Sequence, residues 1–338
     1  LHGPLLRAVI ASAANDHRLG ANEAPPAILS VYLGHQLESV FHDIKDGKLL
    51  EKAKGGLMDL GLSQILKFER DPGDRNRTSP FAFTGNRFEF RAVGSSQSVS
   101  GPLVAMNTIL ADSLNWIAEK LEAVMAKGED QTAAVITVLQ ELMTLHGNVI
   151  FGGDGYSSEW HRVAVEERGL KNIPTSADAL PAFKEESVVK LFESTGVLSP
   201  AELASRFEVY AEQYILSIEM ETNLVVDLAS TRIYPATVAY LDSLASAASN
   251  LNGLDIEMSH NSIQEIASEA NAMMASVRKL KKAISVEDFA SIEKHMNYCA
   301  KTLCPLMLEV RSHADALECI VADDLWPLPK YQEMLFIR

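Results

Sequence analysis

The 338-residue sequence has little cysteine, few basic residues and no long apolar run. Its three cysteines form no Cys-X-X-Cys pair, which favours a reducing cytosol over an oxidising compartment. No apolar run reaches the length that spans a bilayer, and no basic segment with an apolar core and a small-residue cleavage site opens the chain. We therefore expect a cytoplasmic protein.

Acidic residues outnumber basic ones by 45 to 30, which gives a formal net charge of −15. This balance argues against nucleic acid or an anionic membrane as a partner, because both require clustered Lys and Arg. The length and the 47% apolar content allow two domains with a sizeable core. Arginines gathered at one place in such an acidic chain indicate a small anionic ligand.

That place is the stretch 75–91, whose two aromatic-rich halves flank Thr84-Gly85-Asn86. This pattern predicts a β-hairpin with a polar turn. Alternation along the second strand sends Arg87, Glu89 and Arg91 to one face and the two phenylalanines between them to the other, which we expect to be buried. Neighbours on one face of a strand lie about 6–7 Å apart, so one carboxylate can lie between two guanidinium groups.

Two interpretations of this face are open. It can be a solvated sheet surface whose ion pairs contribute about 0.2–1 kcal/mol each. It can also be a metal ligand flanked by phosphate-binding arginines. Arg75 and Arg77, just before the hairpin, favour the second interpretation, because four arginines around one Glu suit an anion bound with a metal.

The run Arg75-Asn76-Arg77-Thr78 followed by Arg87-Phe88-Glu89-Phe90-Arg91 resembles the Asn-Arg-Ser/Thr and Arg-X-Glu-X-Arg signatures of the glutamine synthetase catalytic domain. Upstream, Arg18-Leu19 followed by Glu23-Ala24-Pro25 resembles a further signature of that family. These segments are most similar to the long, type III branch. Several ordered motifs are a stronger signal than one isolated pattern.

The resemblance implies an ATP-dependent glutamate–ammonia ligase that uses Mg²⁺ or Mn²⁺ and forms amides through γ-glutamyl phosphate. It implies that Glu89 ligates the metal, Arg87 contacts the nucleotide and Arg77 contacts both the nucleotide and the transferring phosphoryl group. Arg91 would contact the reacting end of the substrate. These roles match the physical need for cations and metal around ATP, glutamate and a transferring phosphoryl group.

Arg18 and Glu23 lie on a predicted loop at 15–26. Without the resemblance they fit an ordinary surface pair. The resemblance implies instead that Arg18 binds the glutamate carboxylate, and that Glu23 guards the site and takes a proton from ammonium. It also implies a homo-oligomeric ring, a dodecamer.

The chain departs from the family pattern in two ways. Ala82 occupies a position where the family usually has another Arg. The family's upstream metal-binding strands, its nucleotide loop and its small N-terminal domain have no counterpart here. With Leu1 as first residue, we expect the C-terminal portion of a longer protein, inactive alone. The alternatives are a ligase for glutamate and another amine, and a non-catalytic helical assembly module.

Apolar periodicity predicts helices over residues 3–13, 28–44, 101–127 and 131–145. The stripe on the third of these predicts a core face. His35 and His42, with Glu38 between them, suggest a metal site, but two helical turns separate the histidines by about 10.8 Å, which favours a solvated face. The loop 151–156 lacks the Gly-Lys-Ser/Thr of a phosphate loop and predicts a turn before a capped helix.

The polar stretch around residues 172–181 predicts a boundary between residues 1–175, part of the catalytic domain, and a helical domain of residues 176–338. In the second part, stripes over 263–284 and 289–320 predict a long antiparallel helical hairpin, with a kink at Pro305. The fold class we expect is α+β: antiparallel strands with packing helices, followed by an all-α bundle. Assembly is the natural role of the helical part.

Overall fold

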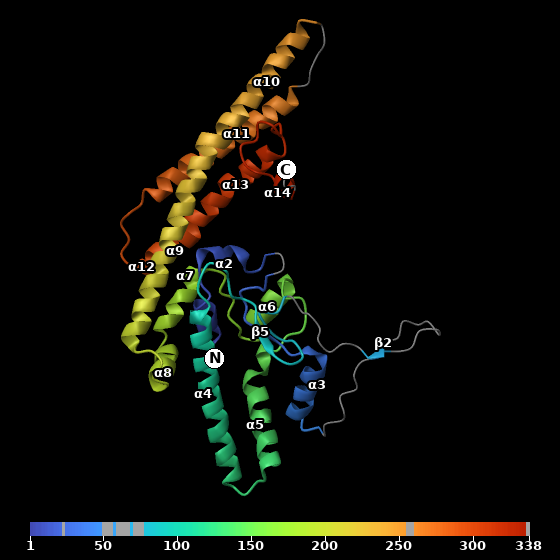
Figure 1. Cartoon of the computed structure of the whole chain (residues 1–338), viewed down its shortest axis with the longest axis vertical. Coiled ribbons are helices and arrows are strands. Elements are labelled where there is room, and N and C mark those ends of the chain that lie inside the picture. Colours follow the sequence, from blue (N-terminus) through green and yellow to red (C-terminus); the bar gives the residue numbers. More distant parts are fainter. Residues whose placement is uncertain (22–23, 49–56, 59–67, 70–77, 255–259, 336–338) are drawn as a thin grey trace. The chain divides into compact units, whose positions relative to one another are not determined.

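The structure is a computed structural model that describes residues 1–21, 24–48, 57–58, 68–69, 78–254 and 260–335 (Figure 1). Its contacts divide the chain into two compact units, Leu1–Tyr210 and Ala211–Arg338. The domain boundary that the polar stretch 172–181 predicts, after residue 175, is a different division of the chain. It stays a prediction. In the described ranges, no helix is both long and apolar enough to cross a membrane.

The first unit combines helices with short strands. Its elements are α1 Gly3–Ala8, α2 Ala13–Arg18, β1 Val31–Tyr32, α3 Gly34–Lys45, β2 Leu57–Met58, β3 Phe68–Glu69, β4 Phe81–Phe83, β5 Phe88–Phe90, α4 Ser100–Met125, α5 Gln131–His146, the 3-10 turn η1 Gly147–Val149, α6 Ser158–Glu166, α7 Ser176–Ala179, the 3-10 turn η2 Leu180–Lys184, α8 Glu186–Ser194 and the first part of α9 Pro200–Leu228.

The main sheet has the strand order β1-β4-β5 and is mixed. β4 and β5 are antiparallel, but β1 runs parallel to β4, with Val31 opposite Phe81. The expectation of antiparallel strands alone was therefore wrong. The cause is the long connection between β1 and β4, which contains α3 and returns the chain in the same direction.

Two predicted helices near the start were too long. The first ends at Ala8, and a new helix begins after Ser12, whose side chain accepts a hydrogen bond from the Asn15 backbone N–H. The predicted loop 15–26 therefore begins inside α2. The second predicted helix starts only at Gly34, because the apolar residues before it pair with strand neighbours instead.

α4 and α5 run side by side as a helical hairpin in the first unit (Figure 1). Lys120 of α4 forms an ion pair with Glu141 of α5. The prediction that the α4 stripe is a core face was partly wrong, since Leu103, Leu110 and Leu114 expose more than half of their surface. α4 also contacts α1 and α8, yet these neighbours leave much of its surface open, and its buried residues are Pro102, Ala105 and Thr108.

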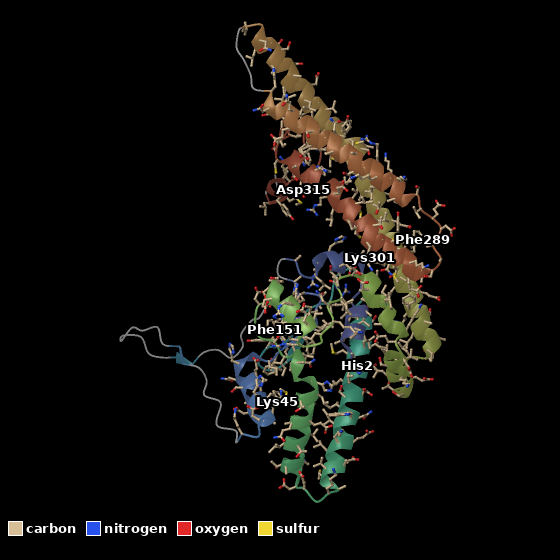
Figure 2. All side chains as sticks on the ribbon, turned by 180° about the vertical axis from the view of Figure 1, so that it is seen from behind. His2, Lys45, Phe151, Phe289, Lys301 and Asp315 are labelled. Atoms are coloured by element: carbon tan, nitrogen blue, oxygen red, sulfur yellow. The ribbon has the colours of Figure 1, made fainter. Side chains whose placement is uncertain are left out.

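Every regular element among the described residues of the second unit is a helix. It contains the rest of α9, the π turn η3 Ala229–Ile233, α10 Tyr234–Asn252, α11 Asn261–Ile284, α12 Ile292–Tyr298, the π turn η4 Cys299–Leu303, α13 Cys304–Glu318 and α14 Tyr331–Leu335. Phe289, labelled in Figure 2, lies just before α12. It stacks on the His295 ring with 4.0 Å between the ring centroids.

α11 and α13 pack along their length in opposite directions. Glu309 accepts hydrogen bonds from Ser276 at 2.8 Å and from Lys279 at 2.7 Å. Further along α13, His313 Nδ1 lies 2.7 Å from a carboxylate oxygen of Glu269. From Glu309 to His313 the chain advances along α13 while its partners on α11 move to earlier residues, so the two helices are antiparallel. Buried side chains fill the space between the two helices, among them Met273, Val277, Leu280, Val310 and Leu317.

Each of the two described π turns in this unit ends two residues before a proline. Pro235 and Pro305 occupy the second positions of α10 and α13. A proline ring crowds the preceding turn and removes one N–H donor, and the wider π turn accommodates both effects. The irregularity predicted at Pro305 therefore takes the form of a π turn.

The cysteines of this unit are expected to differ strongly in reactivity. Cys299 is fully buried, and burial raises the pKa of its thiol to about 12, whereas Cys319 is exposed. Only the thiolate reacts, so iodoacetamide at pH 8 should alkylate Cys319 and spare Cys299. Peptide mass spectrometry measures this, with urea-unfolded protein as the control. Equal labelling of the two thiols in folded protein would contradict the burial.

Candidate active site

The β4–β5 hairpin presents its charged residues on one face, as the alternation predicts. Gly85 in its turn has a φ of +95°, a left-handed conformation that favours glycine. The Thr84 N–H donates to the Arg87 carbonyl at 2.9 Å, and the Arg91 N–H donates to the Pro80 carbonyl at 2.8 Å. These bonds fix the strand register on which the side-chain positions depend.

Glu89 lies between the two arginines of this face. One of its carboxylate oxygens is 3.4 Å from Arg87 Nε, and the other accepts bonds from Arg91 Nε and Nη2, both at 3.2 Å. Exposure falls along the row, from 71% for the Arg87 side chain to 36% for Glu89 and 22% for Arg91. The Arg87 guanidinium is therefore accessible to a ligand, and the Arg91 guanidinium is partly enclosed.

Ala82 lies directly across from Glu89 in the β4–β5 register and is buried. Residues that pair across two antiparallel strands project to the same face of the sheet. The departure from the family pattern at Ala82 therefore lies beside the candidate metal ligand.

The opposite face of the hairpin is apolar but incompletely covered. Phe81 stacks on Phe88 with 5.3 Å between centroids, and Phe83 and Phe90 contact the same cluster. Phe88 is 47% exposed, so the expectation of a buried face was wrong. Strand alternation determines which side chains share a face, while burial depends on which other elements cover it.

Arg18 ends α2 and is joined to the end of β5. Its Nη2 donates to the Arg91 carbonyl at 3.0 Å, and its Nη1 donates to Asn15 Oδ1 at 3.1 Å and to the Ala92 carbonyl at 3.4 Å. Asn15 is buried and donates to the Ala92 carbonyl as well. Gly94 permits this approach, since a Cβ there would lie 3.0 Å from the Asn15 side chain. Two segments of the family signature thus meet in space.

The segment before the hairpin is held by the loop that precedes α6. The Gly155 N–H donates to Thr78 Oγ1 at 2.9 Å, and a Cβ on Gly155 would lie 2.9 Å from the Thr78 carbonyl oxygen. Ser157 caps α6 through the Trp160 N–H. The prediction of a turn before a capped helix is confirmed, and this turn supports the residue next to Arg77.

A buried ion pair lies behind the site, and sequence reasoning missed it. Arg7 is 1% exposed, and its Nη2 lies 2.6 Å from Asp16 Oδ1. Asp16 also accepts bonds from the Ser176 N–H at 2.6 Å and the Ser176 hydroxyl at 2.7 Å. Burial raises the pKa of the Asp16 carboxyl, against the opposing effects of Arg7 and Ser176. This pair connects α1, α2 and the start of α7.

Two predicted site residues, Glu23 and Arg77, lie outside the described residues, as does Arg75. Their predicted roles stay predictions. In the part of the chain that the structure describes, no three His, Cys, Asp or Glu side chains are grouped closely enough to hold a metal. Glu89 is a suitable oxygen ligand for Mg²⁺ or Mn²⁺, but one carboxylate does not make a complete site.

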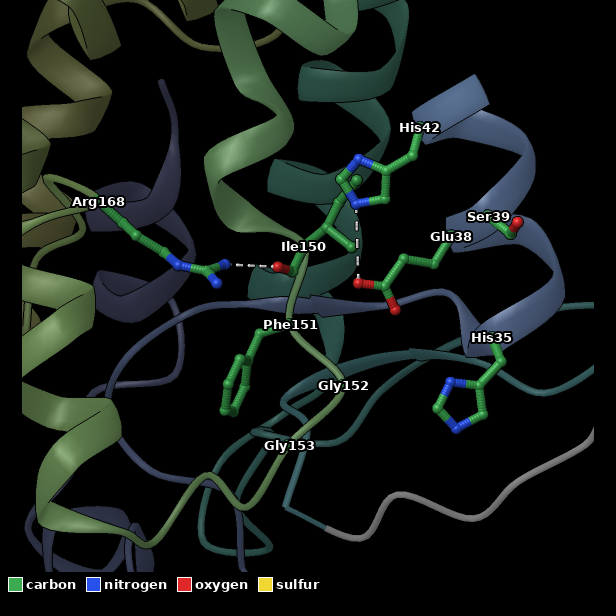
Figure 3. A pocket seen from close by; sticks show the side chains of 9 residues that line it. All are labelled: His35, Glu38, Ser39, His42, Ile150, Phe151, Gly152, Gly153 and Arg168. Carbon is green, nitrogen blue, oxygen red and sulfur yellow. Dashed lines mark hydrogen bonds and ion pairs between the residues drawn. The ribbon is translucent and has the colours of Figure 1, made fainter. Parts of the chain in front are cut away.

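A separate cavity of about 450 Å³ lies between α3 and the strand-like segment Ile150–Gly153 (Figure 3). His35, Glu38 and His42 face it from α3, and Arg168 donates to the Ile150 carbonyl at 2.6 Å. Both histidines are exposed, in agreement with the predicted solvated face, and they also line this pocket. Nothing in the family signatures assigns chemistry to them.

Comparison with known proteins agrees with these motifs. Residues 134–252 match the model of the glutamine synthetase C-terminal domain. The chain is 40% identical over 349 aligned positions to the type-3 glutamine synthetase of Dictyostelium discoideum, an alignment that covers 100% of this chain and 47% of that protein. Glutamine synthetases of Bacteroides fragilis and Butyrivibrio fibrisolvens are 36% and 33% identical, each over 99% of this chain and 47% and 48% of their own lengths.

The chain therefore belongs to the glutamine synthetase family. Within the family, its similarity to a type-3 enzyme confirms the resemblance that the motifs indicated. The chain spans about half the length of the curated relatives that it matches.

Proposed function

We propose that this chain supplies one wall of the active site of a glutamate–ammonia ligase within a longer protein. The observation that carries the proposal is the position of Glu89 between Arg87 and Arg91, on the same strand end to which Arg18 is bonded. Two arginines that flank β5, the carboxylate between them and a third arginine, from α2, meet here. Family membership supports ATP, Mg²⁺ or Mn²⁺, glutamate and ammonia as ligands.

The exposed Arg87 binds nucleotide phosphate oxygens in this proposal, and the more enclosed Arg91 binds the reacting end of glutamate. Arg18 binds the glutamate carboxylate. Three of its N–H groups go to Asn15 Oδ1 and to the Arg91 and Ala92 carbonyls, which fix the guanidinium plane. Two further N–H groups make no bond to the described residues and can hold a carboxylate.

The reaction has two stages. The glutamate γ-carboxylate attacks the terminal phosphorus of ATP, and ADP leaves. Ammonia then attacks the resulting acyl phosphate and expels inorganic phosphate. Arg77, Arg87 and Arg91 stabilise the charge that is spread over the phosphoryl oxygens, and Glu23 takes the proton from ammonium. Bound Mg²⁺ or Mn²⁺, held in part by Glu89, would supply further charge neutralisation.

We further propose that the active protein is a cytoplasmic homo-oligomer, and that residues 1–338 alone are inactive. The family's upstream metal-binding strands and nucleotide loop, which have no counterpart in this sequence, would complete the site.

The test is an assay of the full-length protein for γ-glutamyl hydroxamate from glutamate, ATP and hydroxylamine, and for glutamine with ammonia. ATP- and metal-dependent product is the expected result. Product formed only with larger amines would favour a different glutamate–amine ligase. No product from intact, oligomeric protein would favour the non-catalytic assembly module and overturn the proposal.

A further inference from the structure

Asn15 of α2 has a buried side chain that makes three hydrogen bonds. It is 1% exposed, and its Nδ2 donates to the Ile10 carbonyl at 2.8 Å and to the Ala92 carbonyl at 3.0 Å. Its Oδ1 accepts a bond from Arg18 Nη1 at 3.1 Å. The two amide N–H bonds fix the plane of the amide, and this orients the amide oxygen toward Arg18.

This amide holds both Arg18 and the backbone to which Arg18 is bonded. The Arg18 guanidinium also donates to the Arg91 and Ala92 carbonyls, and Asn15 binds the same strand end through Ala92. Among the residues that the structure describes, Asn15 supplies the only side-chain acceptor for Arg18. A substitution at Asn15 therefore removes an anchor of this guanidinium while both backbone anchors stay in the chain.

Gly94 leaves the space that the Asn15 side chain occupies. A Cβ at Gly94 would lie 3.0 Å from Asn15 Cγ and 3.0 Å from Asn15 Oδ1, which is closer than ordinary van der Waals contact. Gly94 is not among the glycines of positive φ, so its backbone conformation also suits alanine. What requires a glycine at this position is the approach of Asn15.

We propose that Asn15 is a positioning residue for glutamate. With the space that Gly94 leaves, it holds the Arg18 guanidinium in the orientation that binds the substrate carboxylate. This inference rests on the proposed function and deepens it, because it names residues that set the affinity for glutamate and not for nucleotide. Arg87, the proposed nucleotide contact, pairs with Glu89 and makes no bond to Asn15. A change at Asn15 should therefore leave ATP binding unaltered.

The test measures γ-glutamyl hydroxamate formation by the full-length protein, with glutamate and ATP varied in turn. Asn15→Ala should raise the KM for glutamate by roughly 10-fold or more, the effect of losing one hydrogen bond to a charged group. The carboxylate at Arg18 takes no part in the reaction, so kcat and the KM for ATP should change by less than about threefold. Gly94→Ala keeps the amide but displaces it, and should also raise the KM for glutamate.

Ser12→Ala is the matched control for a purely structural effect. The Ser12 hydroxyl accepts from the Asn15 backbone N–H at 3.1 Å and makes no bond to Arg18. Loss of this helix cap should lower the melting temperature and leave the KM for glutamate unchanged. The double variant Asn15→Ala/Gly94→Ala should have a KM for glutamate within about twofold of that of Asn15→Ala, because the closest contacts of the added Cβ are then gone.

The possible failures can be told apart. An active wild type whose Asn15→Ala variant keeps the wild-type KM for glutamate, or loses affinity for ATP equally, would refute the positioning role alone. The same holds if Ser12→Ala raises the KM for glutamate as much as Asn15→Ala does. If Asn15→Ala does not fold, Gly94→Ala decides, and a wild-type KM for glutamate in that variant overturns the inference. An inactive wild type would refute the proposed function, and the inference with it.

Discussion

Replacing Glu89 by Gln in the full-length protein is expected to lower the rate of γ-glutamyl hydroxamate formation by roughly 10²–10³-fold, the effect typical of removing one charge-stabilising group from an active site. The amide keeps the shape of the side chain but removes the negative charge that lies between Arg87 and Arg91. A neutral amide is also a much weaker ligand for Mg²⁺ or Mn²⁺ than a carboxylate. The rate loss should therefore be partly relieved by raised metal concentration.

The matched control is Glu159→Gln in α6. Glu159 also pairs with an arginine, Arg162 at 2.7 Å, but on an exposed helix surface without a family motif. That variant should keep the rate within about twofold, because exposed pairs contribute at most about 1 kcal/mol. For the same reason, neither variant should shift the melting temperature greatly. A Glu89→Gln enzyme with the wild-type rate would show that the Arg-Glu-Arg row is a solvated ion-pair surface.

The row on β5 could be predicted because its geometry is local. Strand alternation alone places Arg87, Glu89 and Arg91 on one face, and in the structure both arginines lie within 3.4 Å of the Glu89 carboxylate. The exposure of the Phe88 side chain could not be predicted, because burial of this face depends on elements distant in sequence. The same holds for residues 28–32, whose apolar pattern suits a helix or a strand until β4 offers a partner.

The contacts around Arg18 show a different limit. The family signature identified Arg18, but its partner Asn15 was assigned only to the predicted loop 15–26. In the structure Asn15 is a buried connector to Ala92, 77 positions away. A single sequence contains no signal for such a pairing. For Arg7 and Asp16, the third partner Ser176 is 160 positions from Asp16, and none of the three belongs to a motif.

Arg7→Met is expected to destabilise strongly the part of the first unit where α1, α2 and the start of α7 meet. Arg7 donates to the Ile173 carbonyl at 2.8 Å and the Pro174 carbonyl at 3.1 Å, besides its ion pair with Asp16. Removing one partner of a buried pair costs about 3–5 kcal/mol, because the other charge stays buried. Amide hydrogens of residues 1–20 and 173–184 should therefore exchange about 10²-fold faster or more, whereas α11 and α13 should be unchanged.

The pH dependence of this variant has a definite sign. Burial already raises the pKa of the Asp16 carboxyl in the folded protein, and loss of Arg7 removes the main charge that opposes this rise. An acid whose pKa is higher folded than unfolded contributes stability below its unfolded pKa and loses that contribution as pH rises through the folded value. Protection factors in the Arg7→Met protein, which are corrected for the intrinsic pH dependence of exchange, should thus be largest at acidic pH and fall toward neutrality.

Arg7→Met/Asp16→Asn separates lost charge from lost packing. The asparagine keeps an oxygen that can accept from the Ser176 N–H, and no charge remains buried. A matched apolar or neutral replacement of both partners is often close to neutral in stability. The double variant should therefore recover most of the protection and lose the pH dependence. If it exchanges as fast as Arg7→Met at every pH, the arginine acts through its bonds to the Ile173 and Pro174 carbonyls rather than through its charge.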